Sequence, residues 1–130
     1  MTAKIPQVIP YLFYDDVDAA IGFLTRAFGF AEHMRVATPS GGVHAQVKLG
    51  DCIIMLGQDG LDKTYATPTK LGRTTAGVFV YLDETDQHYA QAQAEGAEIV
   101  EPIADLPYGR SYTVRDPQGH TWFFTSPKGA

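Results

Sequence analysis

Apolar positions along the chain change from the dense pattern of a β-strand to the spacing of a helix and back. Residues 7–14, QVIPYLFY, are rich in β-branched and aromatic side chains and predict a strand, which Pro10 confines to a sheet edge or a bulge. In the next segment, DDVDAAIGFLTRAFGF, aspartates precede apolar residues at helical spacing, and Gly29 ends the pattern. This segment predicts a capped amphipathic helix. Three shorter strands are expected at residues 32–38, 43–49 and 52–56.

The same order of elements returns in the second half of the chain. When DDVDAA is laid over DETDQH, position 15 falls on position 83, an offset of 68 residues. Ile9 then falls on Gly77, and Tyr11 falls on Phe79. The expected elements are a strand at 77–82, a helix at 83–96 ended by a glycine, and strands at 97–103, 110–116 and 120–125. We therefore predict an α+β fold of two βαβββ modules.

The two modules are expected to form a single domain spanning residues 1–130. Module one covers about residues 5–57, and module two covers about residues 76–127. The loop between them, about residues 58–75, is polar, rich in Gly, Thr and Pro, and longer than an ordinary connection. Two interpretations stay open: the loop is disordered, or it folds over a site with Tyr65 at its tip.

Composition and charge argue against several classes of partner. Net charge is -5 and the ten Lys and Arg are scattered, which argues against a nucleic-acid or membrane-surface partner. No apolar stretch approaches the roughly 18 residues of a membrane span, and no signal peptide is recognisable. The single cysteine, Cys52, lies in an apolar run and predicts a buried thiol. A cytoplasmic protein is expected.

Alternation along the strands assigns residues to the two faces of each sheet. The face covered by the helices is expected to hold Val8, Leu12, Val78, Val80 and Leu82. The opposite face is expected to hold Tyr11, Phe13, Phe79 and Tyr81, together with His44, Gln46 and Lys48. Four aromatic rings with a few polar groups are typical of a concave ligand pocket. The other interpretation is that these rings fill a dimer interface, where aromatic residues are normally enriched.

The paired modules, the helix segment DDVDAAIGFLTRAFGF and the stretch YGRSYTVRDPQGHTWFF resemble the vicinal oxygen chelate superfamily of glyoxalases, bleomycin-resistance proteins and extradiol dioxygenases. The resemblance covers nearly the whole chain apart from the central loop. It implies that the two sheets pair into a curved half-barrel that is completed in a homodimer. It does not choose a function, because the superfamily includes lyases, dioxygenases, epimerases and drug-binding proteins.

The resemblance also locates the positions from which the metal enzymes of the superfamily take their ligands. In this chain those positions hold Ile9, Gly77, Phe123 and Met55. None of these side chains offers the nitrogen, oxygen or thiolate donor that a divalent metal needs. The chain is therefore most similar to the metal-free, bleomycin-resistance-like branch, whose members are homodimers that bind an antibiotic in crevices between subunits. We expect no catalytic residue, no metal ligand and no cofactor.

The same resemblance suggests which residues bind a small molecule. The aromatic before Gly-Arg in YGRSYTVRDPQG lies against the drug in such relatives, which implicates Tyr108. Stacking contacts are assigned to rings and orienting contacts to polar side chains; the full set is Tyr11, Phe13, His44, Gln46, Phe79, Tyr81, Tyr108, Arg110 and Phe123. The expected function is sequestration of an aromatic or planar ligand such as an antibiotic. A further alternative is a metabolic binding or regulatory role with no drug partner.

Histidines offer a second alternative, a glyoxalase-like or dioxygenase-like enzyme with a displaced metal site. That site would be held by His44 and acidic loop residues. A ligand contact or a structural role for His44 fits the sequence better, since no acid is placed beside it. His120 is expected to bond to the preceding turn, and His33 and His88 are expected to face water. The acidic residues Asp15, Asp16, Glu84 and Asp86 are interpreted as helix caps and dipole partners.

Overall fold

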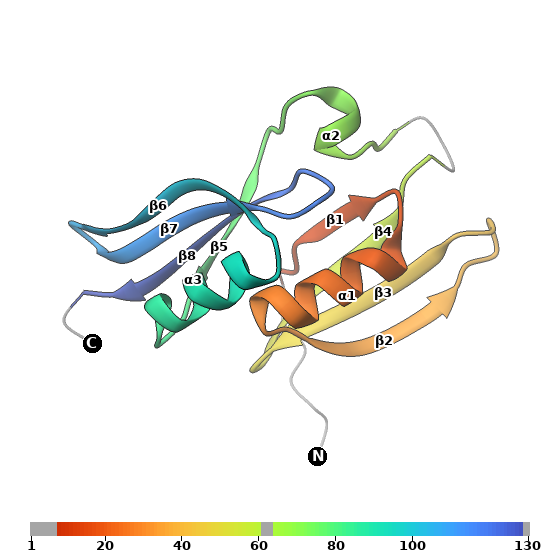
Figure 1. Ribbon diagram of the computed structural model, residues 1–130. Coiled ribbons are helices and arrows are strands. Elements are labelled where there is room, and N and C mark those ends of the chain that lie inside the picture. The colour runs from red at the N-terminus through yellow and green to blue at the C-terminus, as the bar shows by residue number, and fades with distance from the viewer. Residues whose placement is uncertain (1–7, 61–63, 129–130) are drawn as a thin grey trace, which may run out of the picture.

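A computed structural model describes residues 8–60 and 64–128 and contains two four-stranded sheets and three helices. Module one consists of β1 (Tyr11–Tyr14), α1 (Val17–Phe28), β2 (Ala31–Ala37), β3 (Val43–Leu49) and β4 (Cys52–Gln58). Module two consists of β5 (Gly77–Tyr81), α3 (Thr85–Ala94), β6 (Glu98–Leu106), β7 (Gly109–Arg115) and β8 (Thr121–Pro127). The short helix α2 (Pro68–Leu71) lies in the connection between the modules (Figure 1).

Each module forms its own mixed sheet, in the order β1-β4-β3-β2 and β5-β8-β7-β6. The first strand of each module pairs in parallel with the last, and the remaining pairs are antiparallel. Figure 1 shows the two sheets side by side, with α1 and α3 on the same side of the molecule. The predicted α+β fold of two βαβββ modules is confirmed. Closure into a half-barrel with a partner stays a prediction.

Strand register shows how closely the modules repeat. Tyr11 pairs with Met55 as Phe79 pairs with Phe123, so the offset of 68 residues holds for the first and last strands. This register identifies Met55 as the counterpart of Phe123. In the edge strands β2 and β6, β-bulges lie between Glu32 and Met34 and between Ile99 and Glu101. The two modules therefore share a bulge in the corresponding strand, although the residues at the two bulges are not identical.

The core lies between the helices and one face of each sheet. All the apolar residues predicted for the core side of α1 are buried, and Leu12, Val78, Val80 and Leu82 pack against the core. Ala45 and Val47 of β3 are buried, while His44 and Gln46 point to the other side. The face assignment from alternation was therefore right for these positions. Val8 is an exception: it precedes β1 and is exposed. Cys52 is also exposed, because it is the first residue of β4 at the turn.

The two long helices begin in different ways. Asp16 is the N-cap of α1 and accepts a hydrogen bond of 2.9 Å from the Ala19 N–H, and Gly29 ends the helix in the left-handed conformation, both as predicted. Glu84 stands at the N-cap position of α3, but its side chain makes no capping hydrogen bond. The Thr85 N–H instead donates to the Ser126 hydroxyl at 3.1 Å. A side chain of β8 thus replaces the local cap.

His88 lies inside the helix layer, and the expectation that it faces water was wrong. Its Nε2 donates to the Phe28 carbonyl at the end of α1, at 2.8 Å. Nδ1 must then accept, and it does so from the Tyr112 hydroxyl at 2.6 Å. Burial lowers the pKa of His88 and raises that of Tyr112, so the neutral ring is held between α1, α3 and β7. His33 is exposed as expected.

The loop from Asp116 to His120 joins module two to module one. The Asp116 carboxylate accepts from the Tyr14 hydroxyl at 2.6 Å, from Trp122 Nε1 at 3.1 Å, and from the backbone N–H groups of Gln118 and His120. Asp116 is only 4% exposed, so these bonds replace the water that the charge has lost. Burial, and then the Asp116 charge, raises the pKa of Tyr14.

Two further bonds from the same loop reach the start of module one. The Gln118 side chain donates to the Asp16 carbonyl at 2.8 Å and accepts from the Asp16 N–H at 3.1 Å. The His120 ring was expected to bond to its own turn, but Nε2 donates to the Phe13 carbonyl at 2.7 Å. The loop therefore positions β1 against module two.

No helix among the described residues is long and apolar enough to cross a membrane. The cytoplasmic location stays a prediction.

Asp116→Ala is expected to lower the free energy of unfolding by about 3 kcal/mol, because it leaves the buried Tyr14 hydroxyl and Trp122 N–H without an acceptor. Tyr14→Phe, which keeps the ring and removes one of the bonds, should cost about 1.5 kcal/mol. Urea unfolding at pH 7 measures both. Equal losses in the two variants would mean that the carboxylate does not organise the joint.

His88 makes stability depend on pH. Because its pKa is lowered in the folded state, the unfolded chain binds the proton more readily. The contribution of His88 is thus fully present above the unfolded pKa of about 6.5 and is lost as the pH falls through the folded-state pKa. Unfolding between pH 7.5 and pH 5 should show a smaller loss of stability in His88→Gln than in the wild type. His33→Gln is the control and should keep the wild-type slope.

Candidate functional site

A column of three aromatic rings stands on the open face of module one. Tyr11 and Phe13 project from β1 with ring centroids 4.9 Å apart, and Tyr65 of the connecting loop stacks on Phe13 at 3.8 Å, each pair being parallel within 7°. The rings lie over Gly57 of β4, where an added Cβ would come within 2.8 Å of both Tyr11 and Phe13. The absence of a side chain at this position is therefore what lets the rings lie against the strand.

Polar groups adjoin this column on the same sheet face. The Tyr11 hydroxyl lies 2.9 Å from His44 Nδ1, and Gln46 Nε2 lies 3.3 Å from His44 Nε2. Because an amide nitrogen only donates, His44 Nε2 is the acceptor of the bond from Gln46, and the ring hydrogen lies on Nδ1. Tyr11 then accepts from His44, and its own hydroxyl hydrogen is free to be donated to a guest. The structure thus brings Tyr11, Phe13, His44 and Gln46 together.

Module two carries a second ring cluster on the corresponding face. Phe79 lies 5.1 Å from Tyr81 and 6.2 Å from both Tyr108 and Phe123. Phe79, Tyr81 and Tyr108 are 45%, 59% and 50% exposed, which is unusual for rings of this size. Among the described residues, no ring of this cluster contacts a ring of the module-one column. The predicted aromatic residues therefore form two groups within one chain.

Arg110 lies away from both groups. It alternates along β7 with Ser111 and so points to the helix side, where its guanidinium bonds to Asp86 of α3 and to Asp105. These two carboxylates raise the pKa of Arg110. Its neighbour in sequence, Tyr108, does lie beside Phe79. The structure thus separates the two residues that the sequence motif placed together.

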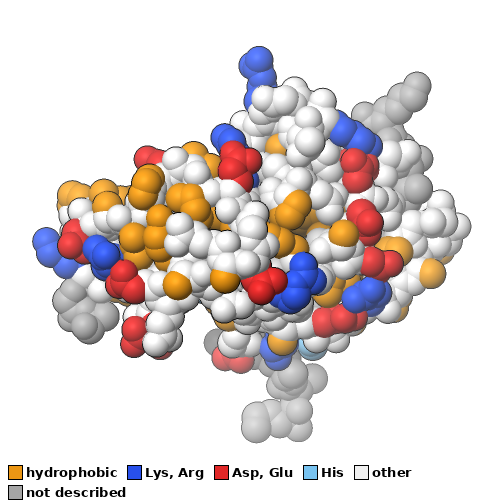
Figure 2. Space-filling model, viewed as in Figure 1, with side chains coloured by type: hydrophobic (Ala, Val, Ile, Leu, Met, Phe, Trp, Pro, Cys, Tyr) orange, Lys and Arg blue, Asp and Glu red, His pale blue; other side chains and the backbone are white. Residues whose placement is uncertain are grey.

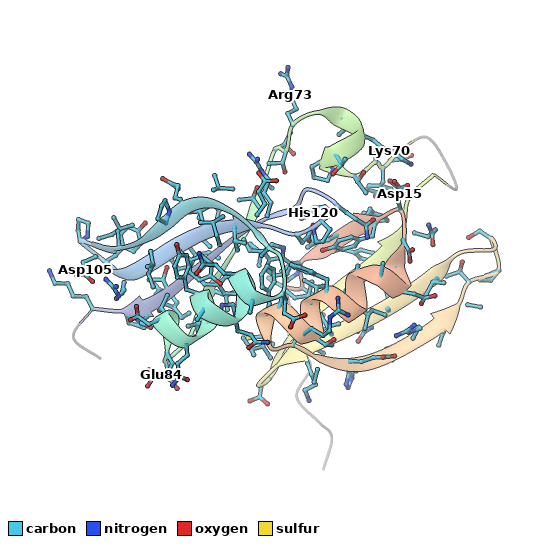
Figure 3. All side chains as sticks on the ribbon, viewed as in Figure 1. Asp15, Lys70, Arg73, Glu84, Asp105 and His120 are labelled. Carbon is cyan, nitrogen blue, oxygen red and sulfur yellow. The ribbon has the colours of Figure 1, made fainter. Side chains whose placement is uncertain are left out.

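The connecting loop folds over module one, as the second interpretation of this segment expected. Lys70 of α2 forms an ion pair with Asp15 (Figure 3). It forms a second ion pair with the buried Asp59, whose carboxylate accepts from the Thr67 N–H at 3.0 Å. Lys70 lowers the pKa of Asp15, whereas burial raises that of Asp59. These contacts hold Tyr65 over Phe13. Residues 61–63 of this loop lie outside the described structure.

An apolar pocket of about 530 Å³ opens between β1, the start of β5 and the connecting loop. Tyr11, Phe13 and Tyr65 form one wall, and His120 contributes a polar edge. The remaining lining includes Leu71, Ala76 and Thr121, which sequence reasoning did not single out. For Leu71, which lies in the connecting loop, the length of that loop was the signal. Gly57, by contrast, was detectable, since an isolated glycine in a strand often marks a close approach.

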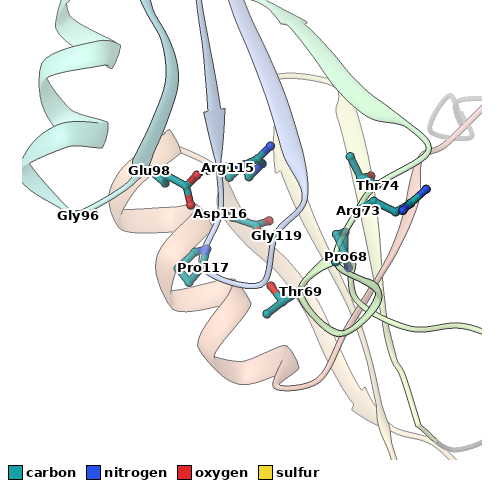
Figure 4. Close-up of a pocket in the computed structure, with 11 residues that line it drawn as sticks. Pro68, Thr69, Arg73, Thr74, Gly96, Glu98, Arg115, Asp116, Pro117 and Gly119 are labelled. Carbon is teal, nitrogen blue, oxygen red and sulfur yellow. Dashed lines mark hydrogen bonds and ion pairs between the residues drawn. The ribbon is translucent and has the colours of Figure 1, made fainter.

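A second pocket, of about 440 Å³, is more polar (Figure 4). Its two arginines do not converge on a guest: Arg115 is paired with Glu98 at 2.9 Å, and Arg73 extends outward from the loop (Figures 3 and 4). The Asp116 carboxylate at its edge is bonded to Tyr14 and Trp122. We therefore place the candidate site at the aromatic faces and the apolar pocket.

Surface charge does not suggest another site on the side that carries the helices. Figure 2 shows Lys and Arg side chains interspersed with Asp and Glu there, and hydrophobic side chains reaching the surface over the half with β6 and β7. In residues 8–60 and 64–128, no three His, Cys, Asp or Glu side chains gather in a way that could hold a metal ion. Met55 pairs with Tyr11 in module one and Phe123 pairs with Phe79 at the equivalent place in module two, and neither side chain supplies a hard donor.

Comparison with known proteins agrees with the fold. The family model described as the Glyoxalase/Bleomycin resistance protein/Dioxygenase superfamily matches residues 4–124. The structure of TioX from Micromonospora sp. ML1 is 34% identical, with a TM-score of 0.76 over 94% of this chain and 98% of that one.

Two antibiotic-binding proteins share the fold at lower identity. TnmS3, an antibiotic binding protein from Streptomyces sp. CB03234, has a TM-score of 0.76 at 20% identity, over 98% of this chain and 100% of that one. The bleomycin-binding protein of Streptomyces verticillus, solved with copper(II)-bleomycin, has a TM-score of 0.68 at 20% identity, with the same coverage of 98% and 100%.

Gly57→Ala should displace the Tyr11 and Phe13 rings, because the new methyl group would lie within 2.8 Å of both. Near-UV circular dichroism is expected to lose intensity from the stacked rings while the far-UV spectrum is unchanged. Gly22→Ala on α1 is the control, since there the added Cβ meets only the end of the flexible Arg26 side chain. An unchanged near-UV spectrum in Gly57→Ala would contradict the packing described for the column.

Proposed function

The chain belongs to the glyoxalase/bleomycin resistance protein/dioxygenase superfamily, and from this premise we propose that it is a metal-free homodimer that binds and sequesters an aromatic or planar small molecule such as an antibiotic. The observation that carries the proposal is the pair of ring clusters on the sheet faces opposite α1 and α3. The family as a whole includes enzymes, so the proposal depends on these residues rather than on the fold.

Stacking on rings supplies affinity without chemistry. Each offset-stacked or edge-on aromatic contact contributes about 0.5–1.5 kcal/mol beyond the burial of its area. A guest that lies against the column of Tyr11, Phe13 and Tyr65, with the free Tyr11 hydroxyl hydrogen donated to an acceptor on the guest, gains both contact area and a fixed orientation. Several such contacts, together with the burial of the guest's apolar surface, reach micromolar affinity, about -8 kcal/mol.

A second copy of the chain would cover the rings that are left open. Phe79 and Tyr81 of β5 lie on the face of the module-two sheet opposite α3, and Tyr108 of the turn before β7 lies beside Phe79. Aromatic residues are enriched in the cores of subunit interfaces. In the homodimer that we propose, the ring cluster of one subunit closes a crevice with its partner. The same rings then serve as interface and as pocket wall.

His44 supports binding better than a displaced metal site. Its ring nitrogens bond to Tyr11 and Gln46, and no carboxylate is bonded to it among the described residues. A metal at His44 would need at least two further donors, and neither a tyrosine hydroxyl nor an amide nitrogen is a strong one. We therefore assign His44 to holding the Tyr11 hydroxyl in position.

A thermal-shift screen of aromatic antibiotics should identify compounds that stabilise the protein, by about 2.7 kcal/mol at a hundred times the dissociation constant.

Phe13→Ala or Phe79→Ala should weaken binding of such a compound about tenfold, as expected for the loss of one stacked ring. Comparing the affinity of Tyr11→Phe with that of Tyr11→Ala separates the contribution of the Tyr11 hydroxyl to binding from the contribution of its ring. Mass spectrometry of the released compound should show it unchanged, and a chemically altered product would overturn sequestration.

A further inference from the structure

A β-bulge turns one acidic side chain of β6 onto the open face of module two. Ile99 pairs with Val114 on the core side, and the next paired residue of β6 is Glu101, opposite Thr113, so that Val100 is the extra residue of the bulge. In a regular strand Val100 would take that place. Bulges re-aim side chains in this manner and are frequent beside binding sites.

Glu101 therefore ends a row of side chains that crosses the whole sheet. Phe79 pairs with Phe123, Phe123 pairs with Thr113, and Thr113 pairs with Glu101. Directly paired residues point to the same face of a sheet, so the row runs from the ring cluster to a carboxylate. Neighbouring strands lie about 4.8 Å apart, which places Glu101 about 10 Å from Phe123.

The carboxylate is oriented yet carries no counter-charge. The Thr113 hydroxyl donates to Glu101 Oε1 at 2.9 Å, and Thr113 itself is only 6% exposed. Glu101 forms no ion pair with any Lys, Arg or His in the part of the chain that the structure describes. Its second oxygen is free to accept from a guest.

Module one lacks this charge at the equivalent position. The corresponding row in module one consists of Tyr11, Met55, Gln46 and Met34. Met34 follows the bulge in β2 and occupies the position that Glu101 occupies after the bulge in β6. The two open faces thus share their geometry and differ in chemistry. Module one offers neutral hydrogen-bonding groups, whereas module two offers rings and a carboxylate.

We propose that the guest is a cationic aromatic compound, with a protonated amine about 10 Å from its ring system, and that Glu101 binds this amine while Phe79 and Phe123 contact the rings. This inference rests on the proposed binding function and specifies its ligand class. The net charge of -5 acts in the same direction, since it raises the local concentration of cations.

A matched pair of fluorescent probes tests the proposal. Dansylcadaverine carries a naphthalene ring and a five-carbon chain ending in an ammonium group, and dansyl pentylamide is the same molecule without the charge. Titration of the wild type, followed by dansyl fluorescence, should show the ammonium probe binding about three- to fivefold more tightly at low salt, which is the range for a solvent-exposed ion pair. The preference should shrink as salt is added.

Glu101→Gln should abolish the preference for the charged probe and leave affinity for the neutral probe unchanged. Glu98→Gln removes the same charge from the same strand, where the carboxylate is already paired with Arg115, and should keep the preference. Phe79→Ala should lower the affinity for both probes to the same extent.

The outcomes separate this inference from the binding function. Equal affinity of the two probes in the wild type, or a preference that survives Glu101→Gln, overturns the role of Glu101 while binding of aromatic guests stands. Failure of the wild type to bind either probe, under conditions where an antibiotic stabilises the protein, overturns the cationic ligand class. Failure to bind any aromatic compound overturns both.

Discussion

The arrangement of this molecule depends on one buried carboxylate. Asp116 stands in the last loop of module two and accepts hydrogen bonds from Tyr14 of module one and from Trp122 of the core. A buried charge is tolerated only where fixed donors replace water, so the carboxylate, its donors and the strands that carry them must come together at once. The loop then adds the bonds of Gln118 and His120 to β1. The first strand of one module is thereby fixed against the last hairpin of the other.

That joint decides which surfaces are left open. With β1 held against module two, α1 and α3 pack together and cover one face of each sheet, and the other faces keep their rings exposed. The connecting loop closes part of the module-one face through Tyr65, because Lys70 and Asp59 hold it there. In module two, Phe79, Tyr81 and Tyr108 stay 45–59% exposed. The two halves of an internal repeat therefore present different surfaces, one a neutral column of rings and the other a ring cluster ending in Glu101.

Individual residues show which side-chain positions the sequence pattern could predict and which it could not. Alternation placed Tyr11, Phe13 and His44 on one face because a strand has a strict period of two, and the structure agrees. It failed for Val8, which precedes the strand and is exposed. The motif had linked Arg110 to Tyr108, but Tyr108 lies in the turn before β7 and Arg110 lies within β7, where it pairs with Asp86 on the helix side. His88 looked like a surface residue among polar neighbours, yet its partners Phe28 and Tyr112 are far away in sequence. Such partners leave no local signal.

The sequence by itself determined the two modules, the offset that relates them, the amphipathic α1 and its caps, and the types of side chain on each strand face, because all of these follow from local periodicity and backbone preference. Only the tertiary structure decided which distant groups meet: Tyr65 on Phe13, His120 on the Phe13 carbonyl, and Glu101 rather than Val100 beside Thr113. Loop closure and bulges depend on the free energy of the whole packed chain, and a shift of a single residue in register reverses the face to which a side chain points.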